Sequence, residues 1–184
     1  TAARLLDHTT VMALRRMPGD DSSCLNLYQV RRPEILGAAP DWIERGGFSF
    51  AQSAAESDRE RENPWSLLDR DDDDGAMPAI GDANTLMWLL KLGIGDSLAI
   101  VDERGNTVNL RIVGMLSGSV LQSQLIIAED RFVELFPSVT GYGKLLLDVP
   151  AEDSTALAAA LADPTAAPDP SVLAMLAATS SLDT

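Results

Sequence analysis

Apolar and polar residues alternate along the chain at two spacings, and this pattern predicts a mixture of helices and strands. Within residues 1–17, apolar side chains recur near helical spacing, which predicts an amphipathic helix that Pro18-Gly19 ends. Residues 24–30 alternate instead and predict a strand. A short helix is expected over residues 40–46.

The strongest pattern lies in the middle of the chain. Residues 77–81 predict a short strand, and Asp82 is suited to cap a helix over residues 83–91. That helix, "ANTLMWLLK", is apolar nearly all round, so it is expected to be buried. Gly93 fits the left-handed position that follows many helices.

A β-hairpin is predicted next, because "DSLAIVD" and "TVNLRIVGML" flank the turn sequence "ERGN". The later elements are a strand at 124–128, a short helix at 129–136, a strand at 142–149, an Ala-rich helix at 151–163, a Pro-rich linker at 164–170 and a last helix. Strands and helices interleave around a central hairpin, so the expected fold class is α+β.

Residues 52–75 are the most polar part of the chain. Between residues 56 and 74 the segment holds nine acidic residues and three arginines. Such a composition buries little apolar surface, which predicts a mobile acidic loop.

Charge and cysteine content exclude several classes of function. The net charge of −14 disfavours nucleic-acid binding and adsorption to an anionic membrane surface. Cys24 is the single cysteine, so an intrachain disulfide and a cysteine-based zinc site are excluded, and Cys24 is expected to be a small core residue. No apolar run reaches the roughly 20 residues of a membrane span. The chain opens on Thr1 without a signal peptide, as expected of a processed product or an excised fragment.

The tetrapeptide Gly95-Asp96-Ser97-Leu98 matches the signature of a family of serine esterases. Serine catalysis needs a base near the nucleophile and a third group that orients the base. In those esterases the serine follows an early strand and opens a helix, whereas here a strand follows Asp96. The base would come from an Asp-x-x-His motif, which this sequence lacks, and the single histidine, His8, is expected at the surface. Ser97 is therefore interpreted as a turn or strand-edge residue.

The acidic run "DRDDDDG" suggests calcium but does not fit an EF-hand. With Gly75 at loop position 6, Arg70 falls at position 1 and Gly81 at position 12. Starting at Asp69 places Asp74 where glycine is required. Neither register fits, and a solvated loop, with at most weak Ca²⁺ binding, is the remaining interpretation. Nucleotide-binding motifs are absent from the sequence, and no metal or cofactor is expected.

The order of short sequence words over residues 19–150 resembles the extracytoplasmic domain of MacB/FtsX-like ABC transporter permeases. In that family a strand and a helix lead to an "lGD" turn, a hairpin ending in "VvGi", an "iii" strand, a short helix and a strand. The corresponding words here are residues 92–96, 112–115, 125–127, 130–136 and 145–148. The words "GDDSSCLNLYQVRRPEILG" and "GSVLQSQ…FPSVTGY" resemble one branch of these permeases, whereas no word beyond Val149 matches.

The resemblance implies an architecture and a set of partners. A β-α-β subdomain would be formed by both chain ends, residues 1–45 and 140–184, and a β-rich subdomain by residues 46–139 with the acidic loop at 52–75. Transmembrane helices would flank the chain in the whole permease. The permease would be a homodimer that works with a cytoplasmic ATP-binding subunit.

The function expected from the resemblance is non-catalytic and extracytoplasmic: coupling of ATP hydrolysis to substrate handling or to activation of a partner outside the membrane. Trp65, Phe48 and Phe50 are the candidate partner surface, because exposed aromatic residues anchor interfaces. Core packing is the competing interpretation of Phe48 and Phe50. A stand-alone extracellular binding or adhesion module is the alternative function, and a hydrolase using Ser97 is a third.

Overall fold

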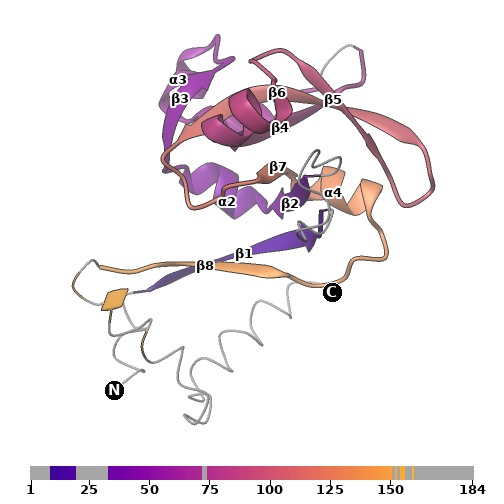
Figure 1. Cartoon of the computed structure of the whole chain (residues 1–184). Coiled ribbons are helices and arrows are strands. Elements are labelled where there is room, and N and C mark those ends of the chain that lie inside the picture. The colour runs from indigo at the N-terminus through magenta and orange to yellow at the C-terminus, as the bar shows by residue number, and fades with distance from the viewer. Residues whose placement is uncertain are drawn as a thin grey trace. The chain divides into compact units, whose positions relative to one another are not determined.

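A computed structural model describes residues 9–19, 33–71 and 74–150, together with residues 152, 154, 155 and 159 (Figure 1). The strands are β1 (Thr10–Met17), β2 (Glu34–Ala38), β3 (Ser49–Ser53), β4 (Met77–Asp82), β5 (Ser97–Val101), β6 (Thr107–Ser117), β7 (Gln124–Ala128) and β8 (Lys144–Asp148). The helices are α2 (Pro40–Arg45), α3 (Asp58–Glu62), the 3₁₀ helix η1 (Pro64–Asp69), the π-helix η2 (Thr85–Leu90) and α4 (Glu129–Leu135). The α+β class expected from the sequence is confirmed.

The chain forms two compact units. One unit consists of Thr1–Ala13 and Gly141–Thr184, and the other of Leu14–Thr140. Residues 14–19 and 33–45, which the resemblance groups with the chain ends, fall in the second unit. In the first unit, β8 is hydrogen-bonded to β1. The division into two subdomains at residues 45 and 140 stays a prediction.

The second unit is built on a mixed sheet. Its strand order is β3-β6-β4-β7-β2-β1, and β5 pairs additionally with β6. The β4–β6 and β2–β7 pairs are parallel, and the β1–β2, β3–β6, β4–β7 and β5–β6 pairs are antiparallel. The hairpin predicted around "ERGN" is confirmed as β5 and β6, in register from Ser97–Arg111 to Val101–Thr107. Its turn is closed by Asp102, which accepts hydrogen bonds from the backbone N–H groups of Arg104 and Asn106.

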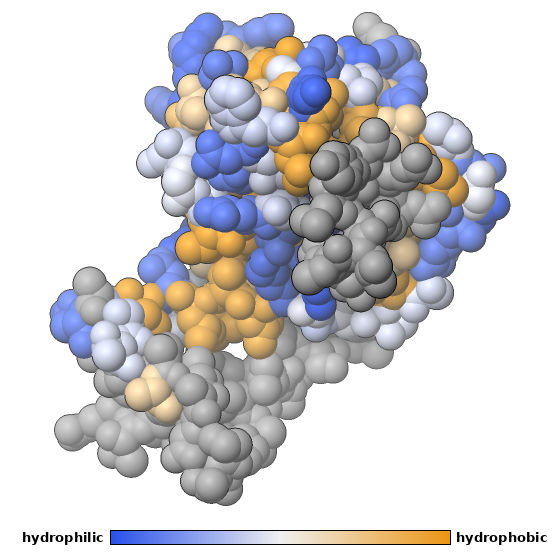
Figure 2. Space-filling model, viewed as in Figure 1, coloured by the Kyte–Doolittle hydropathy of each residue, from blue (hydrophilic) through white to orange (hydrophobic). Residues whose placement is uncertain are grey.

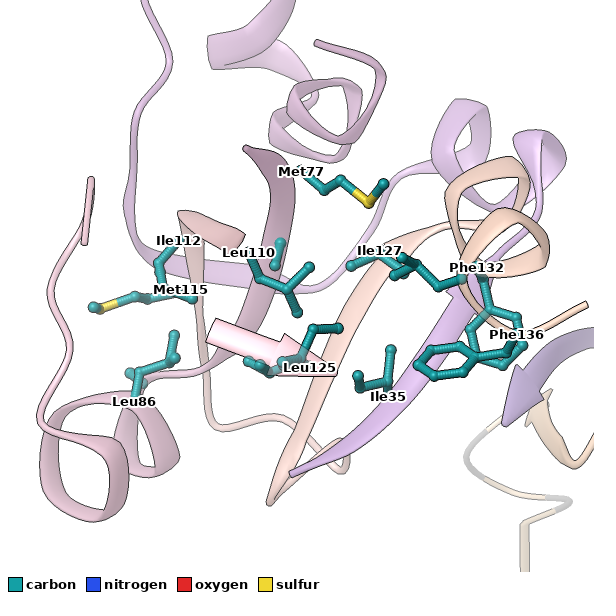
Figure 3. Close-up of a cluster of buried hydrophobic side chains, with 14 residues drawn as sticks. Ile35, Met77, Leu86, Leu110, Ile112, Met115, Leu125, Ile127, Phe132 and Phe136 are labelled. Atoms are coloured by element: carbon teal, nitrogen blue, oxygen red, sulfur yellow. The ribbon is translucent and has the colours of Figure 1, made fainter. Parts of the chain in front are cut away.

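Apolar side chains on one face of this sheet form a core cluster of the second unit. The cluster extends from Leu86 of η2 to Phe132 and Phe136 in and after α4 (Figure 3). Its fully buried members include Leu110, Ile112, Leu125 and Ile127. The strand and helix predicted at residues 124–136 thus supply much of the core, and both are confirmed as β7 and α4.

The N-terminal helix expected over residues 1–17 is wrong where the structure describes it. Residues 10–17 form β1, which pairs antiparallel with β2 from Leu14–Ala38 to Met17–Ile35. Leu14 is fully buried, and Arg15 is buried next to it. Pairing with a neighbouring strand outweighs the helical spacing of the apolar residues, because β structure depends on context that local sequence does not contain.

The acidic segment 52–75, expected to be a loop, contains two helices. Helix α3 begins with a capping box in which Ser57 Oγ accepts from Glu60 N–H and the Glu60 carboxylate accepts from Ser57 N–H. The 3₁₀ helix η1 buries Trp65, Leu67 and Leu68 completely. The prediction of a loop was based on the charge of the segment and did not take these three apolar side chains into account. Their burial compensates the conformational entropy that the segment loses when it folds.

The other predicted elements divide into two groups. The short helix at 40–46 and the strands at 77–81 and 142–149 are confirmed as α2, β4 and β8. The strand at 24–30, the linker at 164–170 and the last helix lie outside the described residues. Most of the Ala-rich helix at 151–163 does as well, although residues 152, 154, 155 and 159 are helical.

Candidate functional site: an exposed apolar helix

The η2 helix is attached to the sheet through buried polar side chains at its start. Asp82, the last residue of β4, is 1% exposed, and its Oδ2 accepts from Thr85 N–H at 3.0 Å and from Thr85 Oγ1 at 3.2 Å. The backbone N–H of Ser123 donates to Thr85 Oγ1 at 2.9 Å. Asp82 therefore caps the helix as the sequence predicts, and Thr85 extends the cap to the connection between β6 and β7.

The other end of η2 closes by a wide turn. The carbonyl of Leu86 accepts from the backbone N–H of Lys91 and, at 2.8 Å, from that of Leu92. Lys91 adopts the left-handed conformation with φ of 56°. The expectation that Gly93 takes this position is wrong, because the π-helical turn ends two residues earlier. Gly93 N–H instead donates to Asp96 Oδ2 at 2.7 Å.

One side of η2 packs against the sheet, and the other is exposed. Leu86 is fully buried and Ala83 is 8% exposed, whereas Met87 is 43%, Trp88 77% and Leu89 47% exposed. The expectation of a fully buried helix is therefore wrong. In the described part of the chain the helix is covered on the β4 side and leaves three consecutive apolar side chains on the opposite side. We call Met87, Trp88 and Leu89 the apolar patch.

The charge around the apolar patch differs from that of the chain as a whole. Lys91 is the single charged residue between positions 83 and 95, in a chain whose net charge is −14. Figure 2 shows areas of hydrophobic surface on one face of the molecule, bordered by hydrophilic side chains. Clustered exposed apolar residues, and an exposed tryptophan above all, mark surfaces that bind other molecules.

Sequence reasoning missed the apolar patch. The run "LMWLL" allows two interpretations: burial on all sides, or an exposed surface on one side. The sequence does not decide between them, because the outcome depends on which elements cover the outer side of residues 83–91.

The structure brings Phe48, Phe50 and Trp65 together in one cluster. The rings of Phe48 and Phe50 pack against Trp65, with their centroids 5.8 Å and 5.6 Å from the centroid of the Trp65 ring. Trp42, which the sequence analysis did not select, completes the cluster at 5.5 Å from Trp65. Trp65 is fully buried and donates its indole N–H to the carbonyl of Gly47 at 2.8 Å.

Phe48 is the exposed member of this aromatic cluster. It is 37% exposed and lies stacked on Trp42 with a centroid distance of 5.7 Å. Its φ of 62° is left-handed and follows positive φ values at Gly46 and Gly47, so the turn is strained at a bulky residue. The ring contacts hold that conformation. The cluster is thus mainly core, with Phe48 as its contact with solvent.

The esterase tetrapeptide forms a turn. Gly95 has a φ of 87°, its N–H donates to the carbonyl of Ile112, and Ile112 N–H donates to the carbonyl of Asp96. Ser97 then opens β5, opposite Arg111. The interpretation as a tight turn into a strand is confirmed. His8, the base such chemistry would need, lies outside the described residues.

The described ends of the acidic run pair with arginines. Asp71 pairs with Arg131 of α4, and Asp74 pairs with Arg111 of β6. A hydrogen bond from Ala76 N–H, with the charge of Arg111 as a further cause, lowers the pKa of Asp74. Among the residues that the structure describes, no group of three or more His, Cys, Asp or Glu side chains is placed to hold a metal ion.

Within the described ranges, no helix has the length and hydropathy of a membrane span. No protein-family profile and no curated protein sequence matches the chain at a significant level. Among solved structures, the chain is similar to the extracellular domain of the noncanonic ABC-type transporter YknZ from Gram-positive bacteria, at 7% sequence identity and a TM-score of 0.38. The alignment covers 82% of this chain and 67% of that one.

Proposed function

We propose that the chain is a non-catalytic extracytoplasmic domain of an FtsX/MacB-type ABC transporter permease, and that the apolar patch is its contact surface for a partner protein. The domain would couple ATP hydrolysis by a cytoplasmic ATP-binding subunit to substrate handling or partner activation outside the membrane. The order of the sequence words over residues 19–150 supports the kind of protein. The exposure of Met87, Trp88 and Leu89 on a helix fixed at both ends is the single observation that carries the contact surface.

A partner of defined chemistry fits this surface. Tryptophan side chains contribute disproportionately to the free energy of protein binding, and Trp88 is already 77% exposed. Lys91 at the edge of the patch favours an acidic rim on the partner, whereas the chain's net charge of −14 repels acidic surfaces elsewhere. The expected partner surface is therefore apolar at its centre and acidic on one side.

Phe48 and Phe50 remain a second candidate contact for a partner. Trp65 is fully buried, so it would pack against these two rings and would not touch the partner. The subdomain division into 1–45 with 140–184 and 46–139 belongs to the same proposal, as do the permease homodimer and the flanking transmembrane helices.

The test of location is cysteine labelling of the full protein in intact cells. In a Cys24→Ser background, Val120→Cys places a thiol at a position 73% exposed, and the neighbouring Leu121→Cys places one at a fully buried position. A membrane-impermeant maleimide is expected to label V120C, but not L121C, without permeabilisation. Labelling of V120C only after permeabilisation would overturn the extracytoplasmic location.

The same tagged protein tests the transporter assignment. Extracted from membranes in mild detergent, it is expected to co-purify with an ATP-binding subunit. The stand-alone adhesion module predicts a different result: surface labelling of V120C, release by alkaline carbonate and no ATPase in the purified material. Trp88→Ala is expected to keep the ATPase subunit bound and to lower transport or partner activation by about tenfold or more, as for an interface hot spot.

A further inference from the structure

One buried hydroxyl lies between two segments that carry exposed apolar side chains. The first is the apolar patch of η2, and the second is the connection between β6 and β7, residues 118–123, where Val120 is 73% exposed. Thr85, 6% exposed, lies between them: its Oγ1 donates to Asp82 Oδ2 and accepts from Ser123 N–H. A threonine hydroxyl has one donor hydrogen, which here is used toward the carboxylate.

The 118–123 connection contains a strained residue and is held in place by side-chain hydrogen bonds. Ser123 has a φ of 61°, a left-handed conformation that is unfavourable for serine. Ser119 is 4% exposed, and its Oγ accepts from Leu121 N–H at 2.9 Å. The connection is thus held by two hydrogen bonds: one within it, from Leu121 N–H to Ser119, and one to Thr85, from Ser123 N–H. Exposed Val120 lies between these two points of attachment.

The helix depends on the same residue. Thr85 N–H is bound by Asp82 in the first turn, and Leu86, the next residue, packs in the core and accepts the two hydrogen bonds that close the helix. The start of η2 also lies close to the sheet, since a Cβ added to Gly81 would come within 3.1 Å of Leu86. A change at Thr85 therefore acts on the helix that carries Trp88 and on the connection that carries Val120.

We infer that Thr85 is a positioning residue that couples η2 to the 118–123 connection, so that the apolar patch and Val120 keep or lose their positions together. The inference deepens the proposed contact surface and rests on it for its functional meaning. A partner bound at Trp88 would, through Thr85, also order Val120, and a displacement of the connection would reach the apolar patch.

The test is native-state amide hydrogen exchange on the 184-residue chain with Thr85→Val. Valine keeps the shape of threonine but removes the hydroxyl. The amides of Lys91, Leu92 and Ser123 are expected to exchange roughly tenfold faster, the factor that corresponds to loss of one ordinary buried hydrogen bond. Amides in the β2–β7 pairing are expected to change by less than about twofold, since local opening does not require global unfolding.

Two control variants distinguish coupling from simple destabilisation. Thr85→Ser retains the hydroxyl and is expected to restore the wild-type rates, and Thr107→Val, at an exposed position of β6, is expected to change none of them. Faster exchange at Ser123 with unchanged rates at Lys91 and Leu92 would overturn the coupling, because Ser123 loses its acceptor directly. Faster exchange at Lys91 and Leu92 with an unchanged rate at Ser123 would overturn it as well. A uniform acceleration that includes β2 and β7 would show a structural role only, and it would overturn the inference too.

If Thr85→Val does not fold, Thr85→Ala is measured in its place with the same criteria. The outcome is separable from that of the proposed function. Coupled local opening in Thr85→Val with unaffected transport in the full protein would support the inference and contradict the contact surface. Loss of transport in Trp88→Ala without coupled opening in Thr85→Val would do the reverse.

Discussion

Glu60 illustrates how single charged residues order the acidic part of the chain. Its carboxylate accepts from the backbone N–H groups of Glu56 and Ser57 and forms a two-point ion pair with Arg70, with both distances 2.7 Å. The Arg70 guanidinium, followed by these backbone N–H groups, lowers the pKa of Glu60 well below the ordinary glutamate value. Helix α3 and the end of η1 are thereby joined through one side chain.

Glu60→Gln isolates the charge from the helix cap, because glutamine also serves in a capping box. The folded-state pKa is lowered, so the ion pair stabilises the native state fully above the ordinary glutamate pKa of about 4.3 and progressively less as the pH falls below it. Wild-type protein is expected to lose stability between about pH 5 and pH 3 more steeply than E60Q, measured as urea midpoints across this range.

The control for this prediction is Glu62→Gln, an exposed glutamate of the same helix. E62Q is expected to follow the wild-type pH dependence. Equal slopes for wild type and E60Q would mean that the Glu60–Arg70 pair does not contribute to stability.

At the scale of elements, sequence patterns predicted what local residues determine and missed what depends on neighbouring elements. The hairpin, β7, α4 and the Asp82 cap follow from alternation, turn residues and capping chemistry within a few positions. Strand β1 could not be predicted, because its partner β2 lies beyond a segment of more than a dozen residues. The apolar patch was missed for a related reason: burial of a helix depends on which elements cover it, and local sequence does not encode that. Trp42 joined Phe48, Phe50 and Trp65 only through tertiary contacts.

Tryptophan fluorescence separates the surface helix from the aromatic cluster. Trp88 is 77% exposed, whereas Trp42 is 4% and Trp65 0% exposed, so Trp88 is expected to account for the emission that acrylamide quenches readily. Trp88→Phe should remove this component and change the free energy of unfolding by no more than about 0.5 kcal/mol, as for most surface substitutions.

Trp65→Phe provides the contrast. It is expected to leave the quenchable component in place and to cost at least about 1 kcal/mol, because the hydrogen bond to Gly47 and part of the packing are lost. Unchanged quenching in W88F would contradict the exposed position of η2.

At the scale of the whole second unit, a largely buried ion pair joins segments distant in sequence. Arg15 of β1 donates from Nε to Glu129 Oε1 of α4 at 2.6 Å, and its Nη1 donates to the carbonyl of Val139 at 3.3 Å. The two charged side chains are 11% and 16% exposed. Charges removed from water to this degree must be paired, so each depends on the other.

Removing one partner is therefore expected to cost more than removing both. Glu129→Leu alone leaves Arg15 buried without its carboxylate and should lower the free energy of unfolding by about 3–5 kcal/mol. The Arg15→Met/Glu129→Leu double variant should recover at least about 1 kcal/mol of that loss, measured by urea denaturation. Strictly additive losses would show that the two side chains do not interact energetically.

The place of β6 in the sheet has a consequence for how the chain folds. β6 is bonded to β5 and β3 along one edge and to β4 along the other, but β5 alone is near it in sequence. Closing the short hairpin costs little entropy, whereas β3 and β4 must arrive across much longer stretches of chain. The hairpin is thus expected to form first and to serve as the template for later strands. Until β3 and β4 pair with β6, the apolar residues near the end of β6 are exposed to solvent. A newly synthesised chain is expected to be most prone to aggregation during this interval.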